Sequence, residues 1–174
     1  MTQFIKYLVL ILIGTSPLPA LAAQFGGYLT SQSDTGVSLF GEGVIASDSG
    51  RTLVAGFDVG GRSYVMKGAD TVTRLVMSPY IGTETLISPT LSLAYRLGLG
   101  ANLAGDKTDY GFISNKVFFK MGQDQVGHDQ QGSERRQISG MMAGWELTIN
   151  SKQPELNGTE VQPLEVSVFL GTVY

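Results

Sequence analysis

Residues 87–103 constrain the fold more than any other stretch, because their character alternates from one residue to the next. The odd positions are Ile87, Pro89, Leu91, Leu93, Tyr95, Leu97, Leu99, Ala101 and Leu103, and the even positions are Ser88, Thr90, Ser92, Ala94, Arg96, Gly98, Gly100 and Asn102. Side chains of a strand point alternately to two faces, so one face here is apolar and the other is small, polar and charged. A helix would scatter the leucines around its circumference. The pattern therefore predicts one long amphipathic strand.

The length of this strand matches the thickness of a lipid bilayer. From Leu91 to Leu103 it extends roughly 43 Å at about 3.3 Å per residue. Tilted by about 45°, it would rise roughly 30 Å, which is the thickness of a bilayer's hydrocarbon core.

The N-terminal segment has the pattern of a secretory signal peptide. Lys6 precedes an apolar run over residues 7–14, and Ala20-Leu21-Ala22 follows as a small-residue cleavage site. The apolar run is too short for a membrane anchor. We therefore predict a signal peptide over residues 1–22 and a mature domain over residues 23–174.

Composition narrows the class of protein. The net charge is −3 and no basic cluster is longer than Arg135-Arg136, which argues against a nucleic-acid partner. The chain has no cysteine and therefore no disulfide framework. Beyond residue 22 no apolar stretch approaches the 18 residues or so that a transmembrane helix needs. An exported chain of this kind is typical of a bacterial envelope.

The rest of the chain continues the alternation. We predict eight strands, with approximate bounds 24–31, 37–46, 51–62, 71–82, 87–103, 110–121, 136–150 and 164–174. Asp34-Thr35-Gly36 and Asp48-Ser49-Gly50 are tight-turn signals, and residues 83–85 form a short link. Residues 122–135 and 151–162 are expected to be polar, irregular connections. No helical period of useful length is present, so the predicted class is all-β with an antiparallel up-and-down order.

Alternation alone does not decide whether the apolar face points inward or outward. In a soluble barrel it fills the interior, and in a membrane barrel it meets lipid. The richer face holds roughly thirty large apolar side chains, which would overfill the interior of an eight-stranded barrel. Volume therefore favours a face that meets lipid, although a two-sheet sandwich would accommodate more of these side chains.

The other face carries nearly balanced charge. Its ionisable residues are Glu42, Asp58, Arg62, Arg74, Arg96, Lys116, Lys120, Glu146 and Glu165. Inside a lumen such groups must pair, because an unpaired buried charge is costly. A solvated face of a soluble sheet would also carry mixed charge. We favour an eight-stranded transmembrane β-barrel whose lumen is plugged by this network, with a narrow ion path gated by the same charges as the alternative.

The last strand supplies the most specific resemblance. Leu164, Val166, Val168 and Leu170 alternate before the aromatic Tyr174. The order of the eight predicted strands resembles that of the small eight-stranded bacterial outer-membrane barrels, such as the transmembrane domain of outer-membrane protein A and outer-membrane protein X. The last strand resembles the C-terminal strand of such proteins. The resemblance implies a place in outer-membrane lipid and recognition of Val166, Val168, Leu170 and Tyr174 by the barrel assembly machinery. Thr172 departs from the apolar or aromatic residue usual there.

The resemblance also raises an enzymatic alternative, because some barrels of this kind are lipid A deacylases that use Ser, His and an acid. His128 is the only histidine, with Ser133 and Glu134 nearby, but the expected close His-x-Ser spacing is absent. With a periplasmic C-terminus, residues 122–135 would lie on the periplasmic side, away from outer-leaflet lipid A. A connection of that length is unusual there, because periplasmic turns are short. We predict no catalytic residue.

No metal-ligand cluster or phosphate loop is present in the sequence, so no metal or cofactor is predicted. Two readings are equally open for the aromatic residues Trp145, Tyr80, Tyr95 and Tyr174: girdles at the two membrane interfaces, or ordinary strand aromatics.

The functional prediction is a non-enzymatic outer-membrane barrel with a structural or surface-interaction role, in which residues 151–162 would contact an extracellular partner. The alternative is a soluble exported barrel or sandwich that binds an apolar ligand among Leu91, Leu93, Val117, Phe119 and Trp145. A lipid-modifying enzyme is the third hypothesis.

Overall fold

A computed structural model describes residues 23–32, 35–65, 71–105, 111–128, 134–151, 155–156, 159–160 and 164–174. The predicted signal peptide, residues 1–22, lies outside the described residues. All regular elements in the described part are strands, and none of it forms a helix long and apolar enough to cross a membrane.

Eight long strands and two very short ones make up the described chain. Their bounds are β1 Ala23–Gln32, β2 Thr35–Asp48, β3 Arg51–Val65, β4 Thr71–Ser88, β5 Leu91–Gly105, β6 Gly111–His128, β7 Glu134–Asn150, β8 Glu155–Leu156, β9 Thr159–Glu160 and β10 Leu164–Val173.

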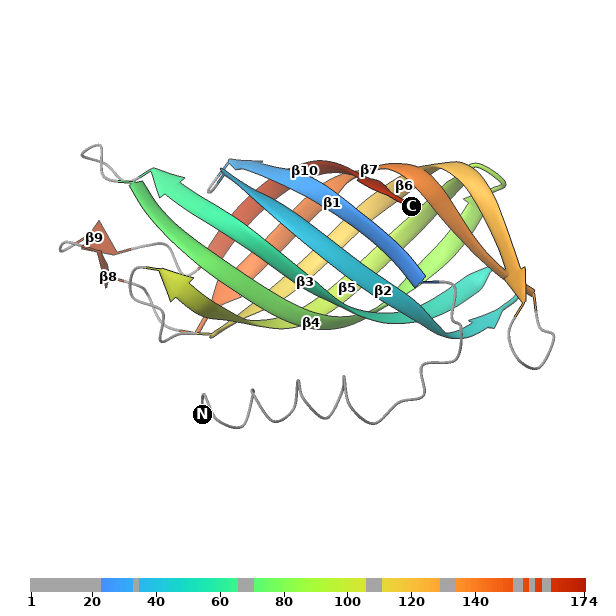
Figure 1. The fold of residues 1–174 in the computed structure, drawn as a ribbon, viewed down its shortest axis with the longest axis horizontal. Helices are drawn as coiled ribbons and strands as arrows, with labels where there is room; N and C mark the ends of the chain where they lie inside the picture. The colour runs from blue at the N-terminus through green and yellow to red at the C-terminus, as the bar shows by residue number, and fades with distance from the viewer. Residues whose placement is uncertain are drawn as a thin grey trace.

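The strands form an antiparallel up-and-down sheet, as the sequence predicts. Each strand from β2 to β6 pairs with the next one along the chain, and β7 pairs with β10. Strand β1 pairs with β2 on one side and with β10 on the other. The sheet curls so strongly that its strands surround a common interior (Figure 1).

The two ends of the curled sheet differ. The β2–β3, β4–β5 and β6–β7 connections lie at the end that also holds the start of β1 and the end of β10, which we call the terminal end. The β8–β9 pair lies at the opposite end, which we call the distal end (Figure 1). Residues 151–162, expected to be irregular throughout, therefore contain this small antiparallel pair.

The conformation of the β2–β3 turn follows from the backbone of two residues, Ser49 and Gly50. Ser49 and Gly50 have φ angles of 47° and 82°, and Asp48 pairs with Arg51 across the turn. Two consecutive positive φ values are typical of the two-residue turns whose twist matches that of the flanking strands. Glycine adopts such a φ without a steric penalty, and the turn predicted at Asp48-Ser49-Gly50 is confirmed.

The prediction of a single strand over residues 87–103 is wrong at its start. Strand β4 runs through residues 83–85, which were expected to be a link, and ends at Ser88. The chain turns at Pro89 and Thr90, and β5 begins at Leu91. Proline has no N–H to donate to a ladder, which favours the turn. A two-residue turn by itself would reverse the odd–even alternation, but the register shift between Leu86 and Ser88 adds one residue and restores it. The pattern therefore runs through the turn undisturbed.

Pro79 lies inside β4, where a proline is unusual. It pairs with Phe57 of β3. On the β5 side, the paired positions pass from Met77–Ala101 directly to Tyr80–Gly98. The ladder is thus interrupted at the residue that lacks a backbone donor.

The irregular connection expected over residues 122–135 is also wrong. Strand β6 continues to His128 and β7 starts at Glu134, with paired positions from Met121–Met141 out to His128–Glu134. The polar run Gln123-Asp124-Gln125 has no apolar alternation, yet its backbone hydrogen-bonds as a strand. Strand pairing depends on the backbone, so a polar composition does not prevent it.

Candidate functional site

Burial in the sheet is the inverse of that in a soluble protein. Along β10 exposed and buried residues alternate, with Leu164, Val166, Val168 and Leu170 exposed and Glu165 and Ser167 buried. Strands β2 to β7 repeat this pattern over most of the length for which side chains are described. Large apolar side chains that are exposed include Val37, Leu39, Ile45, Leu53, Phe57, Leu75, Ile81, Leu93, Leu97, Leu99, Leu103, Ile113, Phe119, Met121, Met141, Trp145 and Ile149.

The charged residues occupy the interior. The nine side chains of the predicted network are between 0 and 6 % exposed, and they are Glu42, Asp58, Arg62, Arg74, Arg96, Lys116, Lys120, Glu146 and Glu165. Burying a charge is tolerated only when it is paired and hydrogen-bonded. The structure meets that requirement with three groups of ion pairs along the interior.

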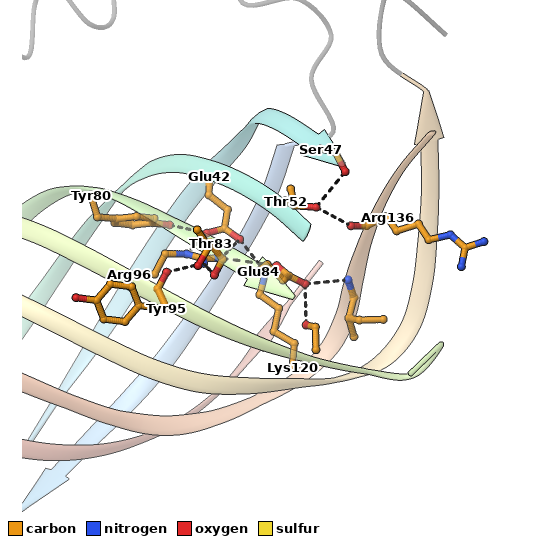
Figure 2. Close-up of polar contacts among 12 residues, drawn as sticks. Glu42, Ser47, Thr52, Tyr80, Thr83, Glu84, Tyr95, Arg96, Lys120 and Arg136 are labelled. Atoms are coloured by element: carbon orange, nitrogen blue, oxygen red, sulfur yellow. Dashed lines mark hydrogen bonds and ion pairs between the residues drawn. The ribbon is translucent and has the colours of Figure 1, made fainter. Parts of the chain in front are cut away.

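The group nearest the terminal end contains two acids and two bases. Glu42 receives two hydrogen bonds from Arg96, from Nε and Nη2, each at 2.8 Å. Lys120 Nζ donates to Glu42 Oε1 and to Glu84 Oε2, both at 2.7 Å. Arg96 also lies 3.7 Å from Glu84. We call Glu42, Glu84, Arg96 and Lys120 the terminal cluster (Figure 2).

Neutral donors complete this cluster. The hydroxyl of Tyr80 donates to Glu42 Oε2 at 3.1 Å, and that of Ser92 donates to Glu84 Oε1 at 2.7 Å. Arg96 Nη1 donates to the backbone carbonyl of Thr83 at 3.0 Å. Tyr80 is 8 % exposed and faces the interior, so of its two readings the place in an interfacial girdle is wrong. It shares its face with Arg74, in step with the β4 alternation.

The middle group again contains two acids and two bases. Arg62 Nη2 donates to Glu146 Oε2 at 2.8 Å, and Ser114 Oγ donates to Glu146 Oε1 at 2.6 Å. Lys116 pairs with Asp58 and lies 3.8 Å from Glu146, which it faces directly across the β6–β7 ladder.

The group nearest the distal end is a single ion pair with a neutral donor. Arg74 Nη2 lies 3.3 Å from each carboxylate oxygen of Glu165. The amide of Asn150 donates to Glu165 Oε1 at 2.7 Å. Among the described residues, each of the three groups holds equal numbers of acids and bases, so the charges of these groups are balanced.

Inward-facing glycines make room for the long side chains. A Cβ on Gly82 would lie 2.6 Å from Cδ of Arg96, its cross-strand neighbour. A Cβ on Gly56 would lie 2.6 Å from the hydroxyl of Tyr80. Neither distance is compatible with a real side chain, so these glycines are needed for the packing of the terminal cluster.

Aromatic and aliphatic side chains fill the space beside the ion pairs. Phe118 packs edge-to-face on Phe169 with ring centroids 5.5 Å apart, and the Arg96 guanidinium lies 5.2 Å from the Phe118 ring centroid. Phe40 and Met142 belong to the same buried cluster. Such close packing of apolar groups lowers the local dielectric and strengthens each ion pair.

Glu84 is the member of the network that sequence reasoning missed. It was assigned to a link between strands, whereas it lies in β4 and is 3 % exposed. The even positions from Arg74 to Tyr80 face inward, and continuing that count reaches Glu84. The alternation therefore contained the signal, and the error was to end the strand at residue 82.

The other predicted site residues lie as follows. Val166, Val168 and Leu170 of the predicted assembly signal are exposed, and Tyr174 is 73 % exposed. The five residues proposed to line an apolar ligand site, Leu91, Leu93, Val117, Phe119 and Trp145, face away from the interior on β5, β6 and β7. The predicted contact surface is residues 151–162, and its side chains from residue 152 onward lie outside what the structure describes.

The histidine that was considered for an enzymatic site, and not predicted to be catalytic, is described only by its backbone. His128 is the last residue of β6 and pairs with Glu134 at the terminal end. Its side chain, and Ser133 altogether, lie outside the described part. Within the residues that are described, no three His, Cys, Asp or Glu side chains are grouped to hold a metal ion.

Comparison with known proteins gives no relative: no family model, curated protein or solved structure matches the chain.

Proposed function

We propose that the chain is an eight-stranded β-barrel of the bacterial outer membrane, non-enzymatic, with a structural or surface-interaction role and a lumen plugged by its ion-pair network. The single observation that carries this proposal is the inverted burial: charges occupy the interior, while the leucines and most isoleucines whose burial is described lie on the outside. In water such a surface would be an extended exposed apolar patch, which soluble monomers avoid. In lipid it is the favourable arrangement.

The pairing of β1 with both β2 and β10 supports closure of the sheet. A sheet that spans a bilayer must be closed, because the hydrocarbon offers no water to satisfy the backbone groups of an open edge. Eight strands leave an interior that side chains fill, and the three ion-pair groups are placed to fill it. We therefore expect the interior of the proposed barrel to be plugged by side chains and not to form a wide pore.

Orientation follows from the resemblance to small outer-membrane barrels. With the terminal end in the periplasm, the β8–β9 pair and residues 151–162 are on the extracellular side, where a partner would bind. The proposed surroundings are outer-membrane lipid, and the proposed route is the barrel assembly machinery, acting on β10. His128 is then periplasmic, which gives a lipid A-modifying reaction no support.

The inverted burial also argues against the alternative, a soluble binder with an apolar interior. That reading requires Leu93, Phe119 and Trp145 to line an enclosed site, but they are 37, 37 and 52 % exposed. The interior instead holds charges, which would repel an apolar ligand.

Electrophoresis in SDS with and without boiling tests the proposal. We expect the protein in the outer-membrane fraction, with an unboiled form that migrates differently from the boiled form, because a closed ladder resists SDS until heated. A detergent-free periplasmic protein without a heat-dependent shift would overturn the barrel. A membrane protein that shifts and also hydrolyses lipid A would overturn only the non-enzymatic assignment.

A further inference from the structure

The ends of β6 and β7 leave the sheet and continue as a pair. Strand β5 pairs with β6 as far as Met121, and β10 pairs with β7 as far as Gly140. Beyond these positions β6 and β7 have only each other as strand partners in the described part, and the N–H of Gly122 makes a last backbone hydrogen bond to the carbonyl of Thr90 at 3.0 Å. We call residues 122–127 and 136–140 the cap ribbon.

Two glycines mark the point where the cap ribbon departs. Gly122 and Gly140 are cross-strand partners, and Gly140 has a φ of 143°. A Cβ on Gly122 would collide with the backbone carbonyl of Ser139, and one on Gly140 would collide with that of Met121. Only glycine at both positions permits this backbone, which is the behaviour of a sharp bend in a strand pair.

After the bend the cap ribbon crosses the terminal end of the curled sheet (Figures 1 and 2). The hydroxyl of Thr52, from β3, donates to the carbonyl of Arg136 at 3.4 Å. The backbone N–H of Ile138 donates to Glu84 Oε1, also at 3.4 Å. Strand β7 thereby approaches β2, β3, β4 and β5, none of which is its neighbour in the sheet.

Burial at this end agrees with a covered opening. Val44 and Val54 face inward near the terminal ends of β2 and β3, and each is 0 % exposed. Ile138 of the cap ribbon is likewise 0 % exposed, and Gln137 is 2 % exposed. Inward residues so close to the rim of an uncovered barrel would be accessible to water.

We propose that the cap ribbon is a lid, hinged at Gly122 and Gly140, that closes the terminal end of the barrel interior to solutes. This proposal rests on the proposed barrel and adds a moving part to it. The lid is coupled to the charged interior, because Glu84 holds Ile138 with one carboxylate oxygen and Lys120 with the other. Opening the lid removes a donor from Glu84 and exposes the terminal cluster from the periplasmic side.

The absence of cysteine from the chain permits a direct accessibility test. Val54→Cys places a thiol beneath the lid, and a charged methanethiosulfonate reagent is added to the protein in detergent micelles. The comparison is between the full-length chain and a variant in which Met121 and Met141 are joined by Asn-Gly, a sequence suited to a two-residue hairpin. We expect the thiol to react at least about tenfold faster without the lid, because a minor open state is populated at 10 % or less.

A matched control reports on the other end of the interior. Val76 is also an inward-facing valine, 4 % exposed, near the distal end of β4. Val76→Cys should react at the same rate with and without the cap ribbon. Equal rates for Val54→Cys in the two backgrounds would overturn the lid.

The hinge is tested separately in the full-length chain. Gly140→Ala cannot keep the observed bend, so we expect faster modification of Val54→Cys there too. This variant decides the matter if the shortened one fails to assemble, and an unchanged rate in it refutes the hinge. Every sample is also run in SDS with and without boiling. A heat-dependent shift with equal thiol rates contradicts the lid alone, whereas no shift in the parent protein contradicts the barrel.

Discussion

Glu42 is the residue on which the terminal cluster depends most. Its two carboxylate oxygens accept hydrogen bonds from Arg96, Lys120 and Tyr80, and it is 4 % exposed. Its partner Arg96 is 54 positions away in the sequence, so this contact ties β2 to β5 across the interior. Glu42 thus supplies half of the negative charge that balances Arg96 and Lys120, and Glu84 supplies the other half.

Neutralising Glu42 should destabilise the protein strongly. Glu42→Gln preserves the side-chain shape but leaves Arg96 and Lys120 with one carboxylate, Glu84, between them. Breaking a buried pair by removing one partner costs about 3–5 kcal/mol. Urea unfolding in lipid vesicles, followed by the fluorescence of Trp145, measures the loss.

Tyr80→Phe is the matched control for that experiment. It removes one neutral hydrogen bond to the same carboxylate and should cost only about 1 kcal/mol. If Glu42→Gln costs no more than Tyr80→Phe, the cluster does not carry the buried charge described here.

At the scale of an element, β5 shows how one strand serves two environments. Leu93, Leu97, Leu99 and Leu103 are exposed on one side, while Ser92 and Arg96 are buried on the other. A slip of one residue in register would exchange the two sets and turn Arg96 to the outer face. The pattern therefore specifies the register of β5 strongly.

A charge on the outward face of β5 should be costly according to depth. Leu97 lies near the middle of the strand, so Leu97→Arg should lower the free energy of unfolding in vesicles by about 2–4 kcal/mol. Leu103→Arg, close to the distal end, should cost about 0–1 kcal/mol by the same rule. In a soluble protein both exposed positions would tolerate arginine within about 0.5 kcal/mol, so equal and small effects would contradict the lipid-facing assignment.

At the scale of the whole molecule, one tryptophan reports on the outer surface. Trp145 is the only tryptophan, it is 52 % exposed, and it is the central outward residue of the run Met141, Ala143, Trp145, Leu147 and Ile149 on β7. In the proposed barrel the exposed part of its indole contacts the acyl chains of the surrounding lipid.

Fluorescence quenching should locate that tryptophan in the hydrocarbon. We expect Trp145 in reconstituted vesicles to be quenched strongly by lipids brominated along the acyl chain and weakly by iodide in the water. Trp145→Phe, with no emission remaining, verifies the source of the signal. Strong quenching by iodide and none by bromine would mean that this face of the sheet meets water.

Much of the fold was predictable because alternation is a local property. The strands, their antiparallel order, the turn at Ser49-Gly50 and the two chemically different faces all follow from residues close together in the chain. The ends of the strands were harder to predict from the sequence. The bulge beside the turn at Pro89 and Thr90 keeps the alternation in phase across that turn, and the polar strand ends around Gln123 carry no apolar signal.

The sequence by itself determined which residues share a face, and with it the set of nine charges that the structure buries together. Only the tertiary structure decided which face is enclosed, which acid meets which base, that Glu84 joins the terminal cluster, and that the β6–β7 pair bends over one end. The physical reason is that the direction of a side chain depends on its own strand, whereas partners such as Glu42 and Arg96 meet across the interior. Their meeting depends on the curvature of the whole sheet and on the registers of several ladders at once.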